Sequence, residues 1–136
     1  MGCINGSTCK TLTFYVDINR GKDLPTIVMD MRKDDLVIGQ IWLIPISEQC
    51  YQIHLTEVIK KERGYTLDFL REALKVGFSS IDKLEKVFAF IPVNNRLVIK
   101  LTQKCRFKKE GNLTKSHLYE GNMIDQVIYS FSKENL

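Results

Sequence analysis

The first half of the chain consists of short apolar or alternating runs that end at turn residues. Beta-branched and aromatic residues dominate these runs, which is typical of strands. The sequence predicts four strands, over Thr11–Asp17, Thr26–Met31, Leu36–Ile46 and Tyr51–Val58. Gly21–Leu24 predicts a turn, and Arg32–Asp35 between the second and third runs favours an antiparallel hairpin. Trp42, in the third run, is predicted to belong to the core.

A helical pattern follows, directly after a basic loop. Leu67, Leu70, Ala73, Leu74 and Phe78 recur at intervals of three and four. This spacing predicts a helix from about residue 65 to residue 79, with one apolar face packed on a sheet. Three cations precede the helix, at Lys60, Lys61 and Arg63, where free backbone N–H groups and the helix dipole favour an anion. Two interpretations stay open: a phosphate-binding turn, or a solvated basic loop before a core helix.

The second half of the chain predicts a strand, a helix and a hairpin. Leu84–Ile91 is almost continuously apolar, as expected of a strand buried on both faces, and Pro92 ends it. Asn94 or Asn95 can cap a second helix, whose apolar stripe is Leu97, Val98, Leu101 and Cys105. Leu113–Tyr119 and Met123–Phe131 predict a hairpin around Glu120–Asn122. The element order predicts an α+β domain whose helices cross a largely antiparallel sheet.

Length and composition limit the remaining alternatives. The 136 residues suffice for one core, so residues 11–136 are predicted to form a single domain after a flexible segment, residues 1–10. No window approaches the 18 or so apolar residues of a membrane span. The four cysteines form no CxxC pair, which excludes a convincing zinc set and, without a signal peptide, favours free thiols in the cytoplasm.

The charge pattern gives little support to nucleic-acid binding. The net charge of +4 is mild, and the basic residues near residues 60–63 and 104–109 each flank a predicted helix. A nucleic-acid groove needs a denser basic stripe interleaved with aromatic residues. Binding through Lys104, Arg106, Lys108 and Lys109 therefore stays an alternative that nothing beyond charge supports.

Two motifs carry a resemblance to a known family. The run Lys61-Glu62-Arg63-Gly64-Tyr65-Thr66 occupies a strand-to-helix turn, and Asn95, Phe107, Glu110 and Gly111 follow at a characteristic spacing. Over about residues 36–131 the chain resembles the GCN5-related N-acetyltransferases. Gly64 matches that family's acyl-CoA motif. Thr66 stands where the family has glycine or alanine, and Arg106 stands where the family has glycine. Residues 90–111 look most like the acetyltransferase-like proteins of tailed bacteriophages.

The resemblance implies a GNAT-like α+β fold that binds acetyl-CoA without a metal. The strands at residues 51–58 and 84–91 would splay apart at one end, and pantetheine would fill the gap. The pyrophosphate would rest on N–H groups of the 61–66 turn, where Thr66 could donate its hydroxyl or crowd the site. The implied cofactor-binding residues are Val58, Lys61, Glu62, Arg63, Gly64, Tyr65, Thr66 and Asn95.

The resemblance implies less about catalysis. Thr102 and Val98 stand where family members carry a Tyr or a Ser that protonates the leaving thiolate. His54 and Glu57 are candidate bases, but strand alternation puts them on opposite faces unless a bulge intervenes. Histidine exchanges protons readily near neutral pH, so His54 is the candidate catalytic residue, against the alternative of a packed or solvated side chain.

The N-terminal part departs from the family. Between Tyr15 and Thr26 there is room for a turn and not for the two helices that wall the family's acceptor site. Two functions follow. The first is an acetyl-CoA-dependent N-acetyltransferase acting on an unidentified amine. The second is a catalytically degenerate GNAT-like virion, assembly or interaction protein of a phage. Either protein could form a homo-oligomer. The expected location is the cytoplasm or, for a phage protein, the host cytoplasm or the virion.

Overall fold

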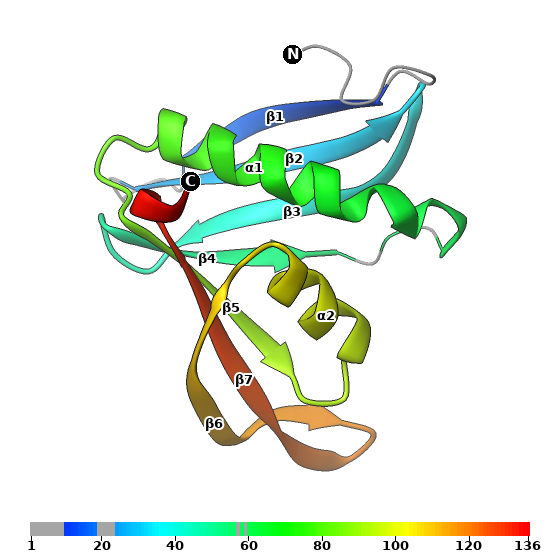
Figure 1. Ribbon diagram of the computed structural model, residues 1–136, viewed down its shortest axis with the longest axis vertical. Coiled ribbons are helices and arrows are strands. Elements are labelled where there is room, and N and C mark those ends of the chain that lie inside the picture. Colours follow the sequence, from blue (N-terminus) through cyan, green and yellow to red (C-terminus); the bar gives the residue numbers. More distant parts are fainter. Residues whose placement is uncertain (1–9, 19–23, 57, 59) are drawn as a thin grey trace.

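The computed structural model describes residues 10–18, 24–56, 58 and 60–136. Figure 1 shows one twisted sheet with two α-helices. The elements are β1 (Lys10–Ile18), β2 (Pro25–Lys33), β3 (Leu36–Pro45), β4 (Cys50–Leu55), a 3₁₀-helix η1 (Lys60–Tyr65), α1 (Thr66–Ser80), β5 (Lys86–Pro92), α2 (Arg96–Lys104), β6 (Lys108–Tyr119), β7 (Asn122–Ser132) and a 3₁₀-helix η2 (Lys133–Asn135). The predicted α+β class and element order are confirmed. The predicted Gly21–Leu24 turn lies, except for Leu24, outside the described residues.

The sheet splits between two of its strands. Its order is β1-β2-β3-β4-β5-β7-β6, and β4 and β5 form its parallel pair. That pair is joined over only three residue pairs, the last of which is Gln52 with Phe88. Beyond it the two strands separate, while β4 stays paired with β3 as far as Leu55. The strand ends there and not at Val58 as predicted. In Figure 1 the β1–β4 half and the β5-β7-β6 half diverge from this junction.

Both α-helices pack on the same face of the sheet. Phe69 and Leu74 of α1 are buried with Met29 of β2 and Leu43 of β3 in one core. A Cβ at Gly77 would lie 2.6 Å from Leu43 Cδ1, so the missing side chain lets α1 approach β3 closely. This offsets the roughly 1 kcal/mol that glycine costs relative to alanine inside a helix. Residues of α2 pack against β4 and β5 on that same face.

The opposite face shows two corrections to the predicted core. Trp42 is half-buried there, and its Nε1 donates a hydrogen bond to Gln40 Oε1 at 3.1 Å. Burial alternates along β5, where Phe88 and Phe90 are only half-buried, so this strand is not buried on both faces. An almost continuous apolar run hid the alternation because both of its faces carry aromatic or aliphatic side chains.

The second helix also differs from its predicted stripe. Asn95 caps α2 as expected, but Leu97 is 62% exposed. The helix ends with Phe107 N–H bonded to Thr102 O and Arg106 N–H bonded to Gln103 O, which is a Schellman motif. Arg106 takes the left-handed conformation of that motif, with φ of 66°. The family resemblance places a glycine at this position, and this backbone conformation explains why glycine suits it.

Candidate functional site

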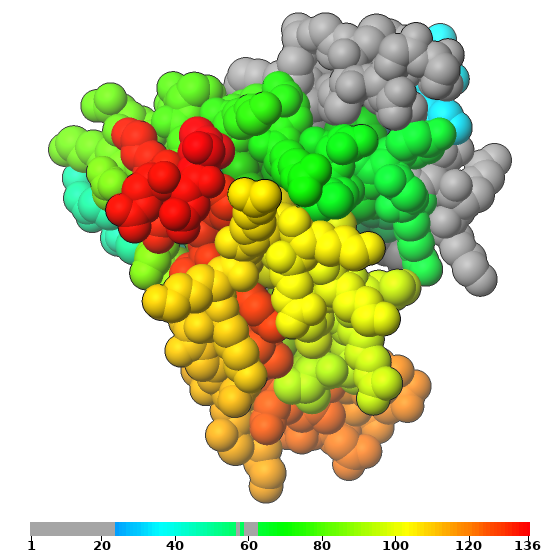
Figure 2. Space-filling view, viewed as in Figure 1, coloured from blue at the N-terminus to red at the C-terminus, as the bar shows by residue number. Residues whose placement is uncertain are grey.

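An open cleft of about 650 Å³ lies between the N-terminal end of α1 and α2. We call it the outer cleft. Its lining is Leu55, Thr56, Val58, Arg63, Gly64, Thr66, Leu67, Asn95, Leu97, Val98, Lys100, Leu101 and Lys104. Figure 2 shows α2 and α1 adjoining on this face of the molecule. The floor of the outer cleft is apolar, whereas cations stand around it, which suits a ligand with a long arm and an anionic end.

The turn before α1 supplies one wall of the outer cleft. No side chain caps the first turn of α1, and Gly64 has open space where a Cβ would stand. Thr66 is only 5% exposed, and its hydroxyl makes no hydrogen bond within the described residues. Thr66 lines the outer cleft, so its hydroxyl is a candidate hydrogen-bond donor to a ligand bound there. The 3₁₀-helix η1 runs directly into α1, so the features that suit an anion at this turn are the open position at Gly64, the Thr66 hydroxyl and the dipole of α1.

Asn95 supplies the opposite wall, and its side chain is fixed by its role as a helix cap. Its Oδ1 accepts a hydrogen bond from Val98 N at 3.4 Å, which leaves the Nδ2 protons available to a ligand. Asn95 lines both the outer cleft and a second, smaller cavity. The two therefore meet at this residue.

The smaller cavity, which we call the inner gap, occupies the split between β4 and β5. It has a volume of about 110 Å³. Its lining is Ile53, His54, Leu55, Leu70, Ala89, Phe90, Ile91, Pro92, Asn95, Val98, Leu101, Thr102 and Phe107. Because Leu55, Asn95, Val98 and Leu101 line both spaces, the outer cleft continues into the inner gap. A linear ligand can thus enter between the helices and end between the strands.

Few groups at the inner gap can transfer protons. His54 is exposed, lines the gap and pairs through its backbone with Trp42. Thr102 is buried, and its hydroxyl donates to Val98 O at 2.7 Å, which commits its proton to the helix backbone. Val98 lines the gap with an aliphatic side chain. Among the described lining residues, His54 is therefore the one with acid–base capacity.

The other predicted site residues have different fates. Val58 is buried and lines the outer cleft together with Arg63, Gly64 and Thr66. Tyr65 is not part of that lining, and Lys33 Nζ lies 4.9 Å from the centre of its ring. Lys61 and Glu62 belong to η1, and the structure describes their backbone only. Glu57, the alternative base, lies outside the described residues.

Sequence reasoning missed two residues of the outer cleft. Lys100 and Lys104 of α2 both line it, on the side opposite Arg63. Their spacing of four residues on a predicted helix places them on one face, which was the available signal. In the sequence, Lys104 is conspicuous only as the first of the basic residues at 104–109.

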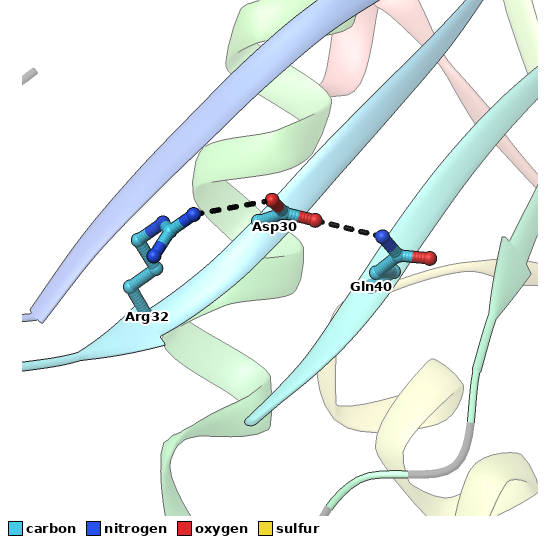
Figure 3. Close-up of polar contacts among 3 residues, drawn as sticks. All are labelled: Asp30, Arg32 and Gln40. Atoms are coloured by element: carbon cyan, nitrogen blue, oxygen red, sulfur yellow. Dashed lines mark hydrogen bonds and ion pairs between the residues drawn. The ribbon is translucent and has the colours of Figure 1, made fainter. Parts of the chain in front are cut away.

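The opposite face of the sheet carries a polar network. Gln40 Nε2 donates to Asp30 Oδ1 at 2.8 Å, and Arg32 lies 3.5 Å from Asp30 Oδ2. Figure 3 shows these three side chains on the side of the sheet away from α1. Trp42 joins the network through Gln40. His54, which lines the inner gap, pairs with Trp42 in the sheet.

The remaining reactive groups lie outside both spaces. Burial raises the pKa of the Cys105 thiol to about 11, against a smaller opposing effect of Arg71. This thiol therefore stays protonated at neutral pH and is a poor nucleophile. Within the described residues no three His, Cys, Asp or Glu side chains gather as a metal site. None of the helices described is long and apolar enough to cross a membrane.

Comparisons with solved structures identify the fold. Spermidine N-acetyltransferase from Vibrio cholerae, in complex with CoA and spermine, superposes with a TM-score of 0.73 at 19% identity over 81% of this chain and 67% of that one. The microcin C7 self-immunity acetyltransferase MccE, in complex with acetyl-CoA and AMP, gives 0.69 at 17% identity over 79% and 61%. A probable acetyltransferase gives 0.73 at 20% over 82% and 64%. No family model and no curated protein matches the sequence.

The chain thus has the fold of the GCN5-related N-acetyltransferases. It spans 61% to 67% of the length of the three structures named. At identities of 17% to 20% the likeness establishes the fold and leaves activity to the chemistry of the site.

Proposed function

We propose that this protein binds acetyl-CoA in the outer cleft and transfers its acetyl group to an amine at the inner gap. The observation that carries this proposal is the continuity of the two spaces through the split between β4 and β5. A basic turn at the N-terminus of α1 lies at one end of the path, and a narrow gap with one acid–base group among its described residues lies at the other.

In this proposal the residues of the outer cleft fix the cofactor. The N–H groups at the start of α1, the Thr66 hydroxyl and Arg63 bind the pyrophosphate. Pantetheine lies beside β4 beyond Gln52, where the strand has no β5 partner and its edge can pair with amide groups of the arm. Asn95 Nδ2 donates to a carbonyl of that arm.

The chemical step needs little from the protein beyond positioning and one base. The nitrogen lone pair of a neutral amine attacks the thioester carbonyl, the C–S bond breaks, and the thiolate leaves. His54 accepts the amine proton, either directly or through water. Solvent protonates the thiolate, since Thr102 donates its proton to Val98 O.

One observation favours a second candidate. Apart from His54, which the transferase uses as its base, the described residues of the inner gap offer no free proton donor to the leaving thiolate. This is expected of a GNAT-like virion, assembly or interaction protein that has lost catalysis. This candidate differs from the first in one measurable respect, which is the turnover of acetyl-CoA.

Calorimetric titration with acetyl-CoA tests the first part of the proposal. Wild-type protein is expected to bind in the micromolar range, and Gly64→Trp to lose binding because the indole fills the phosphate end of the cleft. A Cβ added at Gly64 would have no other atom within 4 Å, so variants at this position should fold normally. Gly64→Ala is the matched control and should retain most of the affinity. No binding at millimolar acetyl-CoA would refute the proposal.

Thiol release in the presence of an amine panel tests the second part. The panel contains polyamines, aminoglycosides, free amino acids and a lysine-rich protein. Turnover that depends on one amine supports the transferase. Binding without turnover for any amine supports the degenerate candidate instead.

A further inference from the structure

The inner gap borders a sheet face that neither α-helix covers, which we call the open face. Gln40 of β3 points to this side, away from α1 (Figure 3). Trp42 follows Gln40 by two residues and therefore points the same way, and His54 pairs with Trp42 across the β3–β4 ladder. The candidate base thus stands on the open face, where an acceptor can reach it from the side opposite the helices.

Aromatic rings stand on both sides of His54. The strand β4 lies between β3 and β5, and Phe88 of β5 shares the open face because it pairs with Gln52 of β4. Phe90 follows on the same side and lines the inner gap with His54. The rings of Phe88 and Phe90 are stacked, with centroids 6.5 Å apart and planes 27° apart. Both are half-buried, as is Trp42 on β3, so all three keep surface for a ligand.

The carboxylates beside these rings are already paired. The strands β3, β4 and β5 contain no Asp or Glu. On β2, Asp30 forms an ion pair with Arg32 at 3.5 Å. Beside β5, Glu110 forms one with Lys86 at 3.5 Å, and Lys86 Nζ also lies 5.7 Å from the centre of the Phe88 ring. Neither of these described carboxylates is left for an ammonium group of a substrate.

This arrangement distinguishes between classes of amine. A polyamine keeps at least one further ammonium group when its reacting nitrogen is neutral, and that charge needs a counter-ion if it leaves water. An amine on an aromatic body brings no such charge, and its ring gains by stacking on aromatic side chains. Trp42 offers its ring and not a donor, because its Nε1 already donates to Gln40 Oε1 at 3.1 Å. The open face therefore suits a single amine on an aromatic body.

We propose that the acceptor is a primary amine carried on an aromatic body, whose ring lies between Trp42 and the rings of Phe88 and Phe90 while its nitrogen points to His54. This inference rests on the proposed function and names the class of acceptor. The acetyl thioester meets the nitrogen from the other side of the gap. A C–N bond forms, the C–S bond breaks, His54 takes the amine proton, and the aromatic body stays on the open face.

The experiment compares kcat/KM for three acceptors at saturating acetyl-CoA: 2-phenylethylamine, n-butylamine and spermidine. Wild-type protein is expected to favour 2-phenylethylamine over each of the others by about 10-fold or more, since burial and stacking of the ring add to binding. n-Butylamine has the same single charge without the ring, and spermidine has additional charges. The comparison thus separates recognition of the ring from recognition of charge.

Variants of the open face test the assigned residues. Trp42→Leu and Phe88→Leu should each lower the ratio of kcat/KM for 2-phenylethylamine to that for n-butylamine by about 10-fold. Because this is a ratio within one preparation, partial loss of folded protein does not change it. Tyr119→Leu is the matched control, since Tyr119 is an exposed aromatic residue of the β6–β7 hairpin that lines neither space.

The outcomes separate the two levels of the proposal. If wild type acetylates no amine at all, the proposed function and this inference both fail. If it acetylates spermidine or n-butylamine at least as well as 2-phenylethylamine, the transferase stands and the aromatic acceptor is wrong. If the ratio is unchanged in both Trp42→Leu and Phe88→Leu, the ring binds elsewhere and the assignment to the open face is wrong.

Discussion

The outer cleft and the inner gap are two parts of one path, and they differ in chemical equipment. The outer cleft combines a helix N-terminus, a hydroxyl, a helix-capping asparagine and three cations that form no ion pair within the described residues. The inner gap is lined mostly by aliphatic and aromatic side chains, with His54 as its one acid–base group among the described residues. Groups that bind a cofactor are thus abundant, whereas groups that perform chemistry are few.

Because the binding groups lie in the outer cleft and the one acid–base group lies at the inner gap, binding and turnover can be tested separately in this protein. Changes in the outer cleft should alter affinity, whereas changes in the inner gap should alter the rate at unchanged affinity. Changes near α2 but outside both spaces should alter stability alone.

Replacing His54 should cause the largest effect. His54→Ala is expected to lower the turnover of acetyl-CoA by about 100-fold or more, as loss of a general base does, while the dissociation constant of acetyl-CoA stays within about twofold. Steady-state kinetics and calorimetry measure the two quantities. Gln52→Ala is the matched control, because Gln52 precedes His54 on the same face of β4 and does not line the gap. Unchanged turnover in His54→Ala would show that His54 is not the general base.

High pH should weaken the fold through Cys105. The folded protein keeps the thiol proton up to about pH 11, whereas the unfolded chain releases it near 8.5. The free energy of unfolding should therefore be unaffected below about pH 8 and fall by about 2 kcal/mol between pH 9 and pH 11. Urea unfolding across that range measures it. Because lysines also titrate there, the test is the difference in slope from Cys105→Ala, and equal slopes would contradict the prediction.

Asn95→Asp separates the cap from the ligand contact. Aspartate retains the oxygen that accepts from Val98 N, so the melting temperature should not fall. It lacks the Nδ2 donor, so the affinity for acetyl-CoA should drop about tenfold. Asn95→Ala should instead lose affinity and about 1 kcal/mol of stability together. An Asp variant that binds as well as wild type would show that Asn95 serves only as a cap.

Arg106→Gly should give the smallest change, and in the stabilising direction. Arg106 has φ of 66°, which glycine adopts without the steric cost that other residues meet. A gain of about 1 kcal/mol is expected in denaturant unfolding, with binding and turnover unchanged. A loss of stability would mean that the arginine side chain contributes more than its backbone conformation costs.

Much of the fold could be predicted because local patterns determine it. The period of α1 and the alternation in β4 follow from which side of each element meets the core. Leu97 and Trp42 were misplaced because hydrophobicity alone does not say where a sheet face or helix face lacks a partner. The short pairing of β4 with β5 likewise depends on a segment more than 30 residues away in the sequence, which no local pattern reveals.

The candidate site was predictable only in part. Gly64, Thr66 and Asn95 were found through the family resemblance, and the structure places all three on the outer cleft. Tyr65 was drawn in by its place in the motif, although its neighbours in space include Lys33. Lys100 was missed since its role depends on which face of α2 meets the cleft, a tertiary property that one sequence does not encode locally.

Amide chemical shifts of ¹⁵N-labelled protein, followed during titration with acetyl-CoA, test whether the outer cleft and the inner gap form one acyl-CoA site. The account predicts saturable shifts at Gly64, Thr66 and Leu67 at one end of the path and at His54 and Leu55 at the other. Amides of the β6–β7 hairpin around Lys115 should not move. An absence of shifts at millimolar acetyl-CoA, or shifts confined to the hairpin, would contradict the claim that the outer cleft and the inner gap form one acyl-CoA site.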